Sequence, residues 1–206
     1  MNENDILKNV SRETIDKLKT YFELLCQWQN KFNLVSKNSL SDAWNRHFLD
    51  SAQLAQYIDD NISDICDFGS GAGFPGLVLA IIFQEKNIKT HFTLIESIYK
   101  KTLFLNEIIN KFNLNAEVIN ERIENLQHKP FDLITARAVC SLEKLIKYIF
   151  PFCYKNTKCL FLKGQTFSDE IKIAEKIWKF SYNVIPNKLA SDGVVLEIFD
   201  IRRKND

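Results

Sequence analysis

Apolar residues recur along the first part of the chain at the spacing of an amphipathic helix, with polar residues filling the opposite face. Ser11 precedes this pattern at a position suited to an N-terminal cap. After a predicted loop over Ser36–Ser41, we expect a second helix from Ser41 or Asp42 to about Tyr57. Together these helices would form an N-terminal helical extension, residues 1–60. The apolar face of the first helix comprises Ile15, Leu18, Phe22, Leu25 and Trp28.

The remainder of the chain, residues 61–206, alternates short apolar runs with helical patterns. Such alternation is typical of an α/β domain with a mainly parallel sheet and helices on both faces. The predicted strands are Ile65–Phe68, His91–Glu96, Ala116–Asn120, Phe131–Thr135 and Lys158–Leu162, followed by Val184–Ile185 and Val194–Ile201. The predicted helices are Leu77–Phe83, Lys100–Asn110, Leu142–Ile149 and Ser168–Phe180. An Asp192–Gly193 turn between the last two strands predicts an antiparallel edge hairpin.

The second predicted helix carries several polar residues on an otherwise apolar pattern. Leu49, Ala52 and Ile58 suit a buried face of this helix. Arg46 and Asp50 lie one helical turn apart, which predicts an ion pair between them. A lone histidine such as His47 is ordinarily a packed or surface residue, so it does not by itself indicate catalysis.

Composition narrows the class of protein. The 206 residues include 46% hydrophobic residues and 16 phenylalanines, enough for a substantial core. The formal net charge is only +1, so any binding of nucleic acid would depend on local basic patches. Five cysteines without a C-x-x-C pair favour neither a disulfide framework nor a metal site. The polar start of the chain and the absence of a long apolar run predict a cytoplasmic protein without a signal peptide or membrane span.

Glycine is concentrated in one stretch. Four of the six glycines fall within Gly69–Gly76, between a predicted strand and a predicted helix. Pro75 stands near the first turn of that helix, where a missing N–H group costs little. A strand, a glycine-rich loop and a helix N-terminus in this order can hold a nucleotide-like ligand on backbone N–H groups.

Two motifs overlap in this stretch. Gly71–Gly76 matches G-x-G-x-x-G, the dinucleotide signature. Asp67–Gly73 matches D-x-G-x-G-x-G, which resembles the first motif of class I S-adenosylmethionine-dependent methyltransferases. Glu96 ends the second strand of the domain, where a carboxylate can accept hydrogen bonds from both hydroxyls of an adenosine ribose. Because both cofactors contain that ribose, Glu96 does not distinguish them.

The ends of the next two strands carry further candidates. After the third strand, Ile123 could cover an adenine face while Glu124 meets its polar edge. After the fourth strand there is no [DNS]-P-P-[YF] motif, which argues against methylation of an exocyclic amine. Cys140 has no preceding proline and no basic neighbour, so we interpret it as a packing residue and not as a nucleophile. Arg137 is then the polar residue left at this strand end.

Taken together, these motifs resemble the glucose-inhibited division protein B family of bacterial small-subunit ribosomal RNA guanine-N7 methyltransferases. The resemblance covers most of the chain, and its motifs are specific as a set. They are Asn33–Leu34, Arg46–Ser51, Gly69–Gly76, Glu96–Ser97, Lys100–Lys101, Arg122–Glu124, Ala136–Ala138 and Leu162–Gly164.

The resemblance implies a Rossmann-like class I methyltransferase fold with a seven-stranded sheet, and S-adenosylmethionine as cofactor. It places cofactor contacts at Gly69, Phe74, Ile123, Glu124 and Arg137, to which the pattern around the loop adds Gly71 and Glu96. The candidate RNA contacts are Arg46, His47, Lys100, Lys101, Lys163 and the tail Arg202–Lys204.

The implied partner is 16S rRNA within a small ribosomal subunit or its precursor, and the target is a guanine in the decoding region. A monomer is expected. Guanine N7 has a lone pair and no proton at neutral pH, so its attack on a methyl group needs no general base. Arg137 would act by positioning and no catalytic acid or base is assigned. Two alternatives remain open: an NAD-binding Rossmann oxidoreductase, and a cofactor-sensing RNA-binding protein that transfers nothing.

Overall fold

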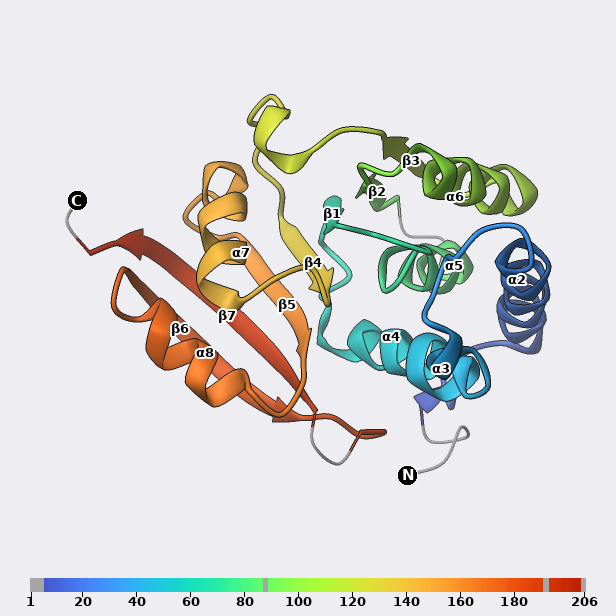
Figure 1. Ribbon diagram of the computed structural model, residues 1–206, viewed down its shortest axis with the longest axis horizontal. Helices are drawn as coiled ribbons and strands as arrows, with labels where there is room; N and C mark the ends of the chain where they lie inside the picture. Colours follow the sequence, from blue (N-terminus) through green and yellow to red (C-terminus); the bar gives the residue numbers. More distant parts are fainter. Residues whose placement is uncertain (1–5, 87–88, 191–192, 205–206) are drawn as a thin grey trace.

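A computed structural model of the chain describes residues 6–86, 89–190 and 193–204 (Figure 1). Its centre is a seven-stranded sheet in the order β3-β2-β1-β4-β5-β7-β6. Strands β1 to β5 are parallel, and β7 runs antiparallel to both β5 and β6. This arrangement confirms the predicted sheet and its edge hairpin, although Asp192 of the predicted turn lies outside the described residues. The strands are β1 (Asp64–Phe68), β2 (His91–Ile95), β3 (Ala116–Ile119), β4 (Leu133–Arg137), β5 (Lys158–Lys163), β6 (Trp178–Pro186) and β7 (Val194–Arg203).

Helices cover both faces of the sheet. The α-helices are α2 (Arg12–Gln29), α3 (Lys37–Leu40), α4 (Asp50–Ala52), α5 (Gly76–Glu85), α6 (Tyr99–Phe112), α7 (Leu142–Ile149) and α8 (Phe167–Ala174). The other helical segments are the π-helix η1 (Trp44–Leu49) and the 3-10 helices η2 (Gln53–Tyr57), η3 (Ile123–Asn125) and η4 (Phe150–Phe152). Figure 1 shows α2, α5 and α6 on one side of the sheet and α7 and α8 on the other.

Alternate residues of each central strand enter two separate cores, one on each face of the sheet. In β1, Ile65 faces the core that contains α2, α5 and α6, whereas Phe68 faces the core that contains α7. Leu18 and Leu25 of α2 are buried in the first of these cores. Truncating such a side chain to alanine typically costs about 2–5 kcal/mol, so α2 contributes to the stability of the whole domain. The boundary near residue 60 stays a prediction.

The N-terminal helix follows its sequence pattern closely. The hydroxyl of Ser11 accepts a hydrogen bond from the Thr14 N–H group at 3.2 Å, which confirms the predicted cap. The predicted loop over Ser36–Ser41 is wrong in part, because Lys37–Leu40 forms a single helical turn, α3.

The second predicted helix reaches Tyr57, but it is irregular, and the ion pair predicted within it is wrong. Its first section, η1, is a π-helix. Among the described residues, Arg46 and Asp50 form no ion pair with each other. Asp50 instead lies 3.7 Å from Arg137 on β4.

Two other boundaries differ from the sequence prediction. Strand β4 begins and ends two residues later than predicted, so Arg137 is its last residue. The predicted helix Ser168–Phe180 is too long, because α8 ends at Ala174 and Trp178 begins β6. Trp178 is buried with its ring centroid 5.0 Å from that of Phe150, a tertiary contact that the local pattern did not reveal.

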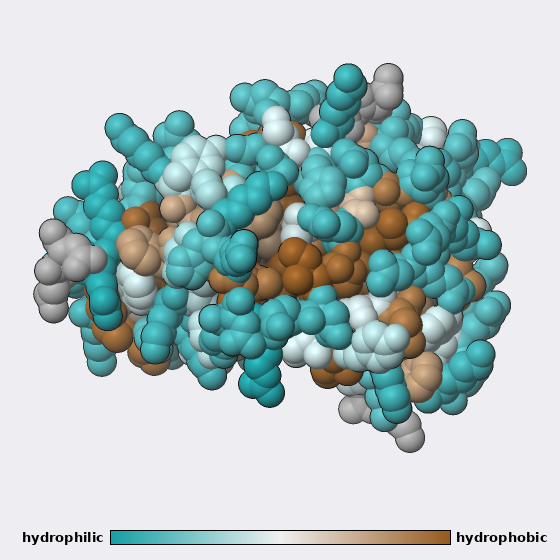
Figure 2. All heavy atoms as spheres, turned by 90° about the horizontal axis from the view of Figure 1, so that it is seen from above, coloured by the Kyte–Doolittle hydropathy of each residue, from teal (hydrophilic) through white to brown (hydrophobic). Residues whose placement is uncertain are grey.

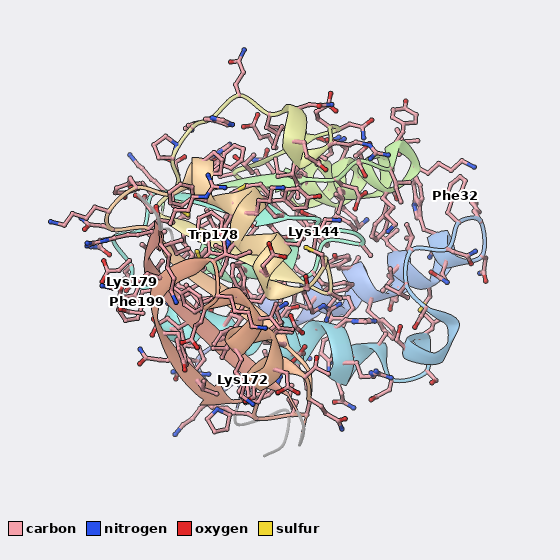
Figure 3. The ribbon with its side chains drawn as sticks, turned by 60° about the vertical axis from the view of Figure 1, so that its left-hand side comes forward. Phe32, Lys144, Lys172, Trp178, Lys179 and Phe199 are labelled. Carbon is pink, nitrogen blue, oxygen red and sulfur yellow. The ribbon has the colours of Figure 1, made fainter. Side chains whose placement is uncertain are left out.

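The molecule is elongated along its sheet. Figure 3 shows Phe32, just beyond α2, on the side of the molecule away from Lys179 and Phe199 of the β6–β7 hairpin. On the face shown in Figure 2, apolar side chains gather near the middle and hydrophilic ones surround them. Among the described helices, none is both long and apolar enough to cross a membrane.

Candidate functional site

The glycine-rich loop between β1 and α5 contains one position that is open to a ligand. Gly69, Gly71 and Gly73 all have positive φ angles, +67°, +60° and +94°. A Cβ atom at Gly69 would lie 2.8 Å from Val139, and one at Gly73 would lie 2.6 Å from Leu77. At Gly71 the nearest atom is a backbone oxygen 3.9 Å away. Gly71 is therefore the glycine at which another molecule can approach the backbone closely.

Glu96 holds this open part of the loop in place. Its side chain lies at the end of β2 and is only 6% exposed. One carboxylate oxygen accepts a hydrogen bond from the Gly71 N–H group at 2.9 Å, and the other accepts from Ile98 at 2.8 Å. The structure thus brings together two of the predicted cofactor contacts. Each carboxylate oxygen still has a free lone pair for a ligand hydroxyl.

Asp67, the acidic residue that opens the loop motif, has an internal role. It is buried, and its carboxylate accepts hydrogen bonds from the Thr135 hydroxyl at 2.8 Å and the Gly76 N–H group at 3.3 Å. Burial raises the pKa of Asp67 to about 6. These bonds join β1, β4 and the start of α5, so Asp67 braces the loop from within.

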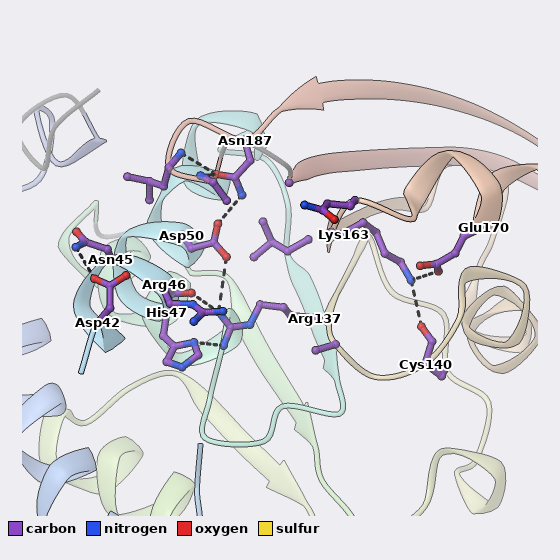
Figure 4. Close-up of a pocket in the computed structure, with 17 residues that line it drawn as sticks. Asp42, Asn45, Arg46, His47, Asp50, Arg137, Cys140, Lys163, Glu170 and Asn187 are labelled. Atoms are coloured by element: carbon purple, nitrogen blue, oxygen red, sulfur yellow. Dashed lines mark hydrogen bonds and ion pairs between the residues drawn. The ribbon is translucent and has the colours of Figure 1, made fainter. Parts of the chain in front are cut away.

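Arg137 is held at the end of β4 by partners from the N-terminal helical segment (Figure 4). Its guanidinium donates to the Arg46 carbonyl oxygen at 2.9 Å, and its Nη2 atom lies 2.6 Å from His47 Nδ1. The Asp50 carboxylate lies 3.7 Å from Nη1, and the Phe74 ring lies under the guanidinium at 5.2 Å. Three predicted site residues, Phe74, His47 and Arg137, are therefore in contact.

The contact with Arg137 fixes the protonation of His47. Since a guanidinium can only donate, His47 Nδ1 must accept, and the ring proton is then on Nε2. Burial, together with the charges of Arg137 and Arg46, lowers the pKa of His47 to about 4. Nε2 is buried and has no hydrogen-bond partner among the described residues. His47 is thus a neutral packing partner of Arg137 at physiological pH.

Phe74 is part of an aromatic cluster and is only 3% exposed. Its ring stacks on those of His47 and Tyr21, with centroids 5.0 and 5.6 Å away. The Tyr21 hydroxyl donates to the Ala72 carbonyl oxygen, which ties α2 to the glycine-rich loop. A ligand at this position could reach the backbone of Phe74 but not its ring. Tyr21 was not among the predicted site residues, because its spacing within α2 indicates only a buried position.

A cavity of about 510 Å³ lies beside Arg137 (Figure 4). Its walls come from η1, the ends of β4 and β5, the start of α8 and the β6–β7 loop. Ala138, directly after Arg137, lines it with a φ angle of +53°, a conformation that is strained for a residue other than glycine. The polar residues of the wall include Asp42, Asn45, Arg46, His47, Asp50, Arg137, Lys163, Glu170 and Asn187.

The charges around this cavity are largely paired. Arg137 faces Asp50, and Lys163 forms an ion pair with Glu170 at 2.8 Å. Arg46 is exposed and forms no ion pair with any described residue. Paired cations attract an anion weakly, whereas polar walls can hydrogen-bond an uncharged group. The cavity therefore suits a nucleobase better than a phosphate, and Arg46 is the cation available at its rim.

Lys163 was predicted as an RNA contact, but its ammonium group is engaged inside the protein. Besides Glu170 it donates to the Cys140 carbonyl oxygen at 3.1 Å. The Cys140 side chain packs against the α7 core, and burial raises the pKa of its thiol. A raised pKa disfavours the reactive thiolate. The environment of Cys140 therefore agrees with its predicted role as a packing residue.

Lys100, Lys101 and the tail Arg202–Lys204, which were also predicted to contact RNA, do not line this cavity. Lys100 lies over the Phe32 ring at 5.1 Å, and Lys101 is part of the first turn of α6. Arg202 and Arg203 lie near the end of β7, beyond the residues that pair with the start of β5. They are thus at the opposite end of the sheet from the glycine-rich loop, and Lys204 follows them.

Ile123 and Glu124 lie in η3 and line a separate pocket of about 390 Å³ with Tyr148. Ile123 is partly buried beside the α7 core, and Glu124 is exposed. Hydrogen bonds from its own backbone N–H group and from Tyr148 lower the pKa of Glu124. In the described part of the chain, neither residue hydrogen-bonds to Glu96 or Arg137, and the pocket they line does not include those two residues. Their part in a cofactor site therefore stays a prediction.

Comparison with known proteins identifies relatives over nearly the whole chain. A family model described as rRNA small subunit methyltransferase G matches residues 14–191. Proteins named ribosomal RNA small subunit methyltransferase G are similar to this chain. The one from Bartonella tribocorum is 40% identical over 200 residues, covering 96% of this chain and 93% of the relative. The one from Paramagnetospirillum magneticum is 39% identical and covers 94% of this chain and 92% of the relative.

Solved structures share the fold at low sequence identity. The ribosomal protein L11 methylase from Lactobacillus delbrueckii subsp. bulgaricus matches with a TM-score of 0.59 and 15% identity, over 77% of this chain and 79% of that one. A SAM-dependent methyltransferase from Aquifex aeolicus matches with a TM-score of 0.57 and 13% identity, over 76% and 92%. These likenesses confirm the predicted methyltransferase fold. From the family match and the identity to its members, this chain belongs to the rRNA small subunit methyltransferase G family.

Proposed function

We propose that this chain transfers the methyl group of S-adenosylmethionine to N7 of a guanine in 16S ribosomal RNA. The observation that carries the proposal is the open backbone at Gly71, which Glu96 fixes at the carboxyl ends of the parallel strands. Ligands of open α/β sheets bind at this edge. The names of the relatives, ribosomal RNA small subunit methyltransferase G, support RNA of the small subunit as the substrate.

The residues around the loop fit a cofactor that contains adenosine. Gly71 leaves room for close approach, and the Glu96 carboxylate keeps lone pairs for two ribose hydroxyls. When bound, S-adenosylmethionine would supply an electrophilic methyl group. Ile123 and Glu124 would contact the adenine, and Gly69 and the Phe74 backbone would complete the loop. Arg137 would border both this site and the cavity beside it.

The cavity beside Arg137 is the proposed place for the target guanine. Its paired charges leave a polar but nearly neutral wall, which suits a base that has been flipped out of an RNA stack. Guanine N7 carries no proton, so the wall needs to orient the base and exclude water but not to remove a proton. The groups available there match this role: His47 is neutral and bound to Arg137, and the Cys140 thiol has a raised pKa.

Arg46 is the residue we expect to bind RNA phosphate. It lies at the cavity rim, is exposed and has no ion-pair partner in the described part of the chain. Lys163 is expected to contribute to folding instead, because it already neutralises Glu170. Lys100, Lys101 and the tail Arg202–Lys204 stay predictions as contacts with more distant parts of the RNA.

Methyl transfer to isolated substrates tests the proposal. Purified protein would be incubated with methyl-labelled S-adenosylmethionine and either 30S subunits or naked 16S rRNA, and the RNA would then be digested to nucleosides. We expect label in 7-methylguanosine alone. RNA binding without incorporation would indicate a cofactor sensor. Tight calorimetric binding of NAD, with no response to S-adenosylhomocysteine, would indicate an oxidoreductase.

A further inference from the structure

Asn187, in the loop between β6 and β7, contacts the partner of Arg137 directly (Figure 4). Its Nδ2 atom donates to Asp50 Oδ1 at 2.6 Å. The other oxygen of Asp50 lies 3.7 Å from Arg137 Nη1. Gln53 joins the group, since its Nε2 atom donates to Asp50 Oδ1 at 2.8 Å and to Asn187 Oδ1 at 3.1 Å. Three segments that are distant in sequence therefore meet at one carboxylate.

The pair that Asn187 supports is largely shielded from water. The side chains of Arg137 and Asp50 are 16% and 14% exposed. At such a site a carboxylate stays charged only if nearby groups hydrogen-bond to it, and a charge that loses its partner is costly. Burial raises the pKa of Asp50, and the hydrogen bonds from Asn187 and Gln53 oppose that rise. The nearby cations are Arg137 on β4 and Arg46 on η1, and the neutral His47 contacts Arg137.

We propose that Asn187 is a positioning residue, which orients the Asp50 carboxylate toward Arg137 and so fixes the Arg137 guanidinium between the glycine-rich loop and the cavity. The inference rests on the proposed function for its effect on methyl transfer. Its effect on the orientation of Arg137 does not depend on that function. The β6–β7 loop lines the cavity, and through Asn187 it also helps to position the reactants.

Asn187 has a second role that the experiment must separate from this one. Its Oδ1 atom accepts from the N–H groups of Leu189 at 2.8 Å and Ala190 at 3.0 Å, which shapes the loop. Asn187→Ala removes both roles. Asn187→Asp keeps oxygen acceptors for the loop, loses the donor to Asp50 and places a second carboxylate against it.

A matched control is available on the same hairpin. Asn183 of β6 donates to the Glu197 carboxylate at 2.7 Å on the exposed side of the hairpin, so Asn183→Asp makes the same chemical change away from the cavity. Asp50→Asn is a second test variant, since it keeps the shape of the side chain and removes its charge. Thermal unfolding of each variant verifies that the fold is retained.

The first readout is the guanidinium Nε–H signal of Arg137 in nitrogen-15 NMR spectra of the ligand-free protein, assigned by its loss in Arg137→Lys. We expect one sharp signal in the wild type and in Asn183→Asp. In Asn187→Asp and Asp50→Asn we expect the signal to broaden or shift. An unchanged Arg137 signal in Asn187→Asp would overturn the inference, whatever the result for Asp50→Asn.

The second readout is methyl transfer to RNA. We expect Asn187→Asp to lower kcat at least tenfold with less than a threefold change in KM for RNA, and to add less than a twofold loss in an Arg137→Ala background. Full activity of Asn187→Asp alongside an impaired Asn187→Ala would assign Asn187 to loop shape only and overturn the inference. If the wild type transfers no methyl group while the Arg137 signal responds as expected, the proposed function fails and the positioning role stands.

Discussion

Glu96 has a role in folding that can be measured without any ligand. Glu96→Ala removes the acceptor of two backbone N–H groups, those of Gly71 and Ile98, which the carboxylate binds at 2.9 and 2.8 Å. Glu96→Gln keeps the shape of the side chain but replaces one oxygen by an NH2 group. Because that group cannot accept a hydrogen bond, only one of the two bonds survives.

The expected loss follows from the number of bonds. A hydrogen bond to a charged acceptor contributes about 1.5–3 kcal/mol. Water can reach part of this loop, since Ile98 is 49% exposed, and it would replace some of the lost interaction. We therefore expect Glu96→Ala to lower the free energy of unfolding by about 2–4 kcal/mol, and Glu96→Gln by about half of that.

Urea unfolding of the ligand-free protein measures this effect. Glu117→Gln is the matched control, because Glu117 is exposed on the neighbouring strand β3 and we expect its change to stay within about 0.5 kcal/mol. Calorimetry with S-adenosylhomocysteine then measures the loss of binding in Glu96→Gln, expected at about 1–3 kcal/mol. If Glu96→Ala unfolds at the same urea concentration as the wild type, the carboxylate does not hold the loop and this reasoning is refuted.

Three further predictions concern the loop, the histidine and the RNA contact. Gly71→Ala places its Cβ atom in open space at a φ angle of +60°, so we expect the free energy of unfolding to fall by only about 1–2 kcal/mol. We also expect calorimetry to detect no binding of S-adenosylhomocysteine to this variant. Normal binding would show that no ligand approaches the backbone at Gly71. Gly73→Ala, whose Cβ atom would fall 2.6 Å from a leucine side chain, should be severely destabilised. His47 has a pKa of about 4 in the folded protein against an ordinary 6.5, so the stability that its neutral form provides is complete above pH 6.5 and is lost as pH falls toward 4. Urea unfolding measures the free energy of unfolding between pH 4 and 7. We expect its fall toward pH 4 to be smaller in His47→Gln than in the wild type, by up to about 3 kcal/mol. If the two proteins lose stability in parallel, His47 does not have the lowered pKa. Arg46→Ala should raise KM for RNA severalfold and reduce the salt dependence of KM, without a change in stability. Lys163→Ala should lower stability, because it leaves the Glu170 carboxylate unpaired. The reverse pattern would show that Lys163 binds the RNA and Arg46 stabilises the fold.

Sequence patterns predicted correctly the helices and strands that are determined by residues close together in the chain. The glycines of Gly69–Gly76 and the apolar runs beside them located β1, the loop and α5, and the amphipathic pattern of α7 gave its bounds, Leu142–Ile149. The pattern failed at Trp178, where an apolar residue that suits a helix face pairs instead with Arg203 of β7. Such pairing involves residues far apart in sequence, so a local period cannot reveal it.

Some contacts of the candidate site could also be predicted from the sequence, and others could not. Gly71 and Glu96 could be placed together, because the carboxyl ends of neighbouring parallel strands meet at one edge. The surroundings of Arg137 could not be predicted, since its partner Asp50 lies far before β4 in the sequence. Asn187, which donates to Asp50, lies far after β4. The ion pair predicted between Arg46 and Asp50 failed for the same reason, because the Asp50 carboxylate faces Arg137 and accepts from Asn187.

The position of the methyl group in cellular RNA tests the central claim most directly. Methylation at N7 gives guanine a fixed positive charge, weakens its glycosidic bond and makes the chain cleavable by borohydride and aniline. In 16S rRNA from cells that lack this gene, one such cleavage should be missing. The purified protein with S-adenosylmethionine should restore it, and Arg137→Ala should restore it poorly while remaining folded. An unchanged cleavage pattern, or a methyl group on an exocyclic amine, on carbon 5 or on a ribose hydroxyl, would contradict the account.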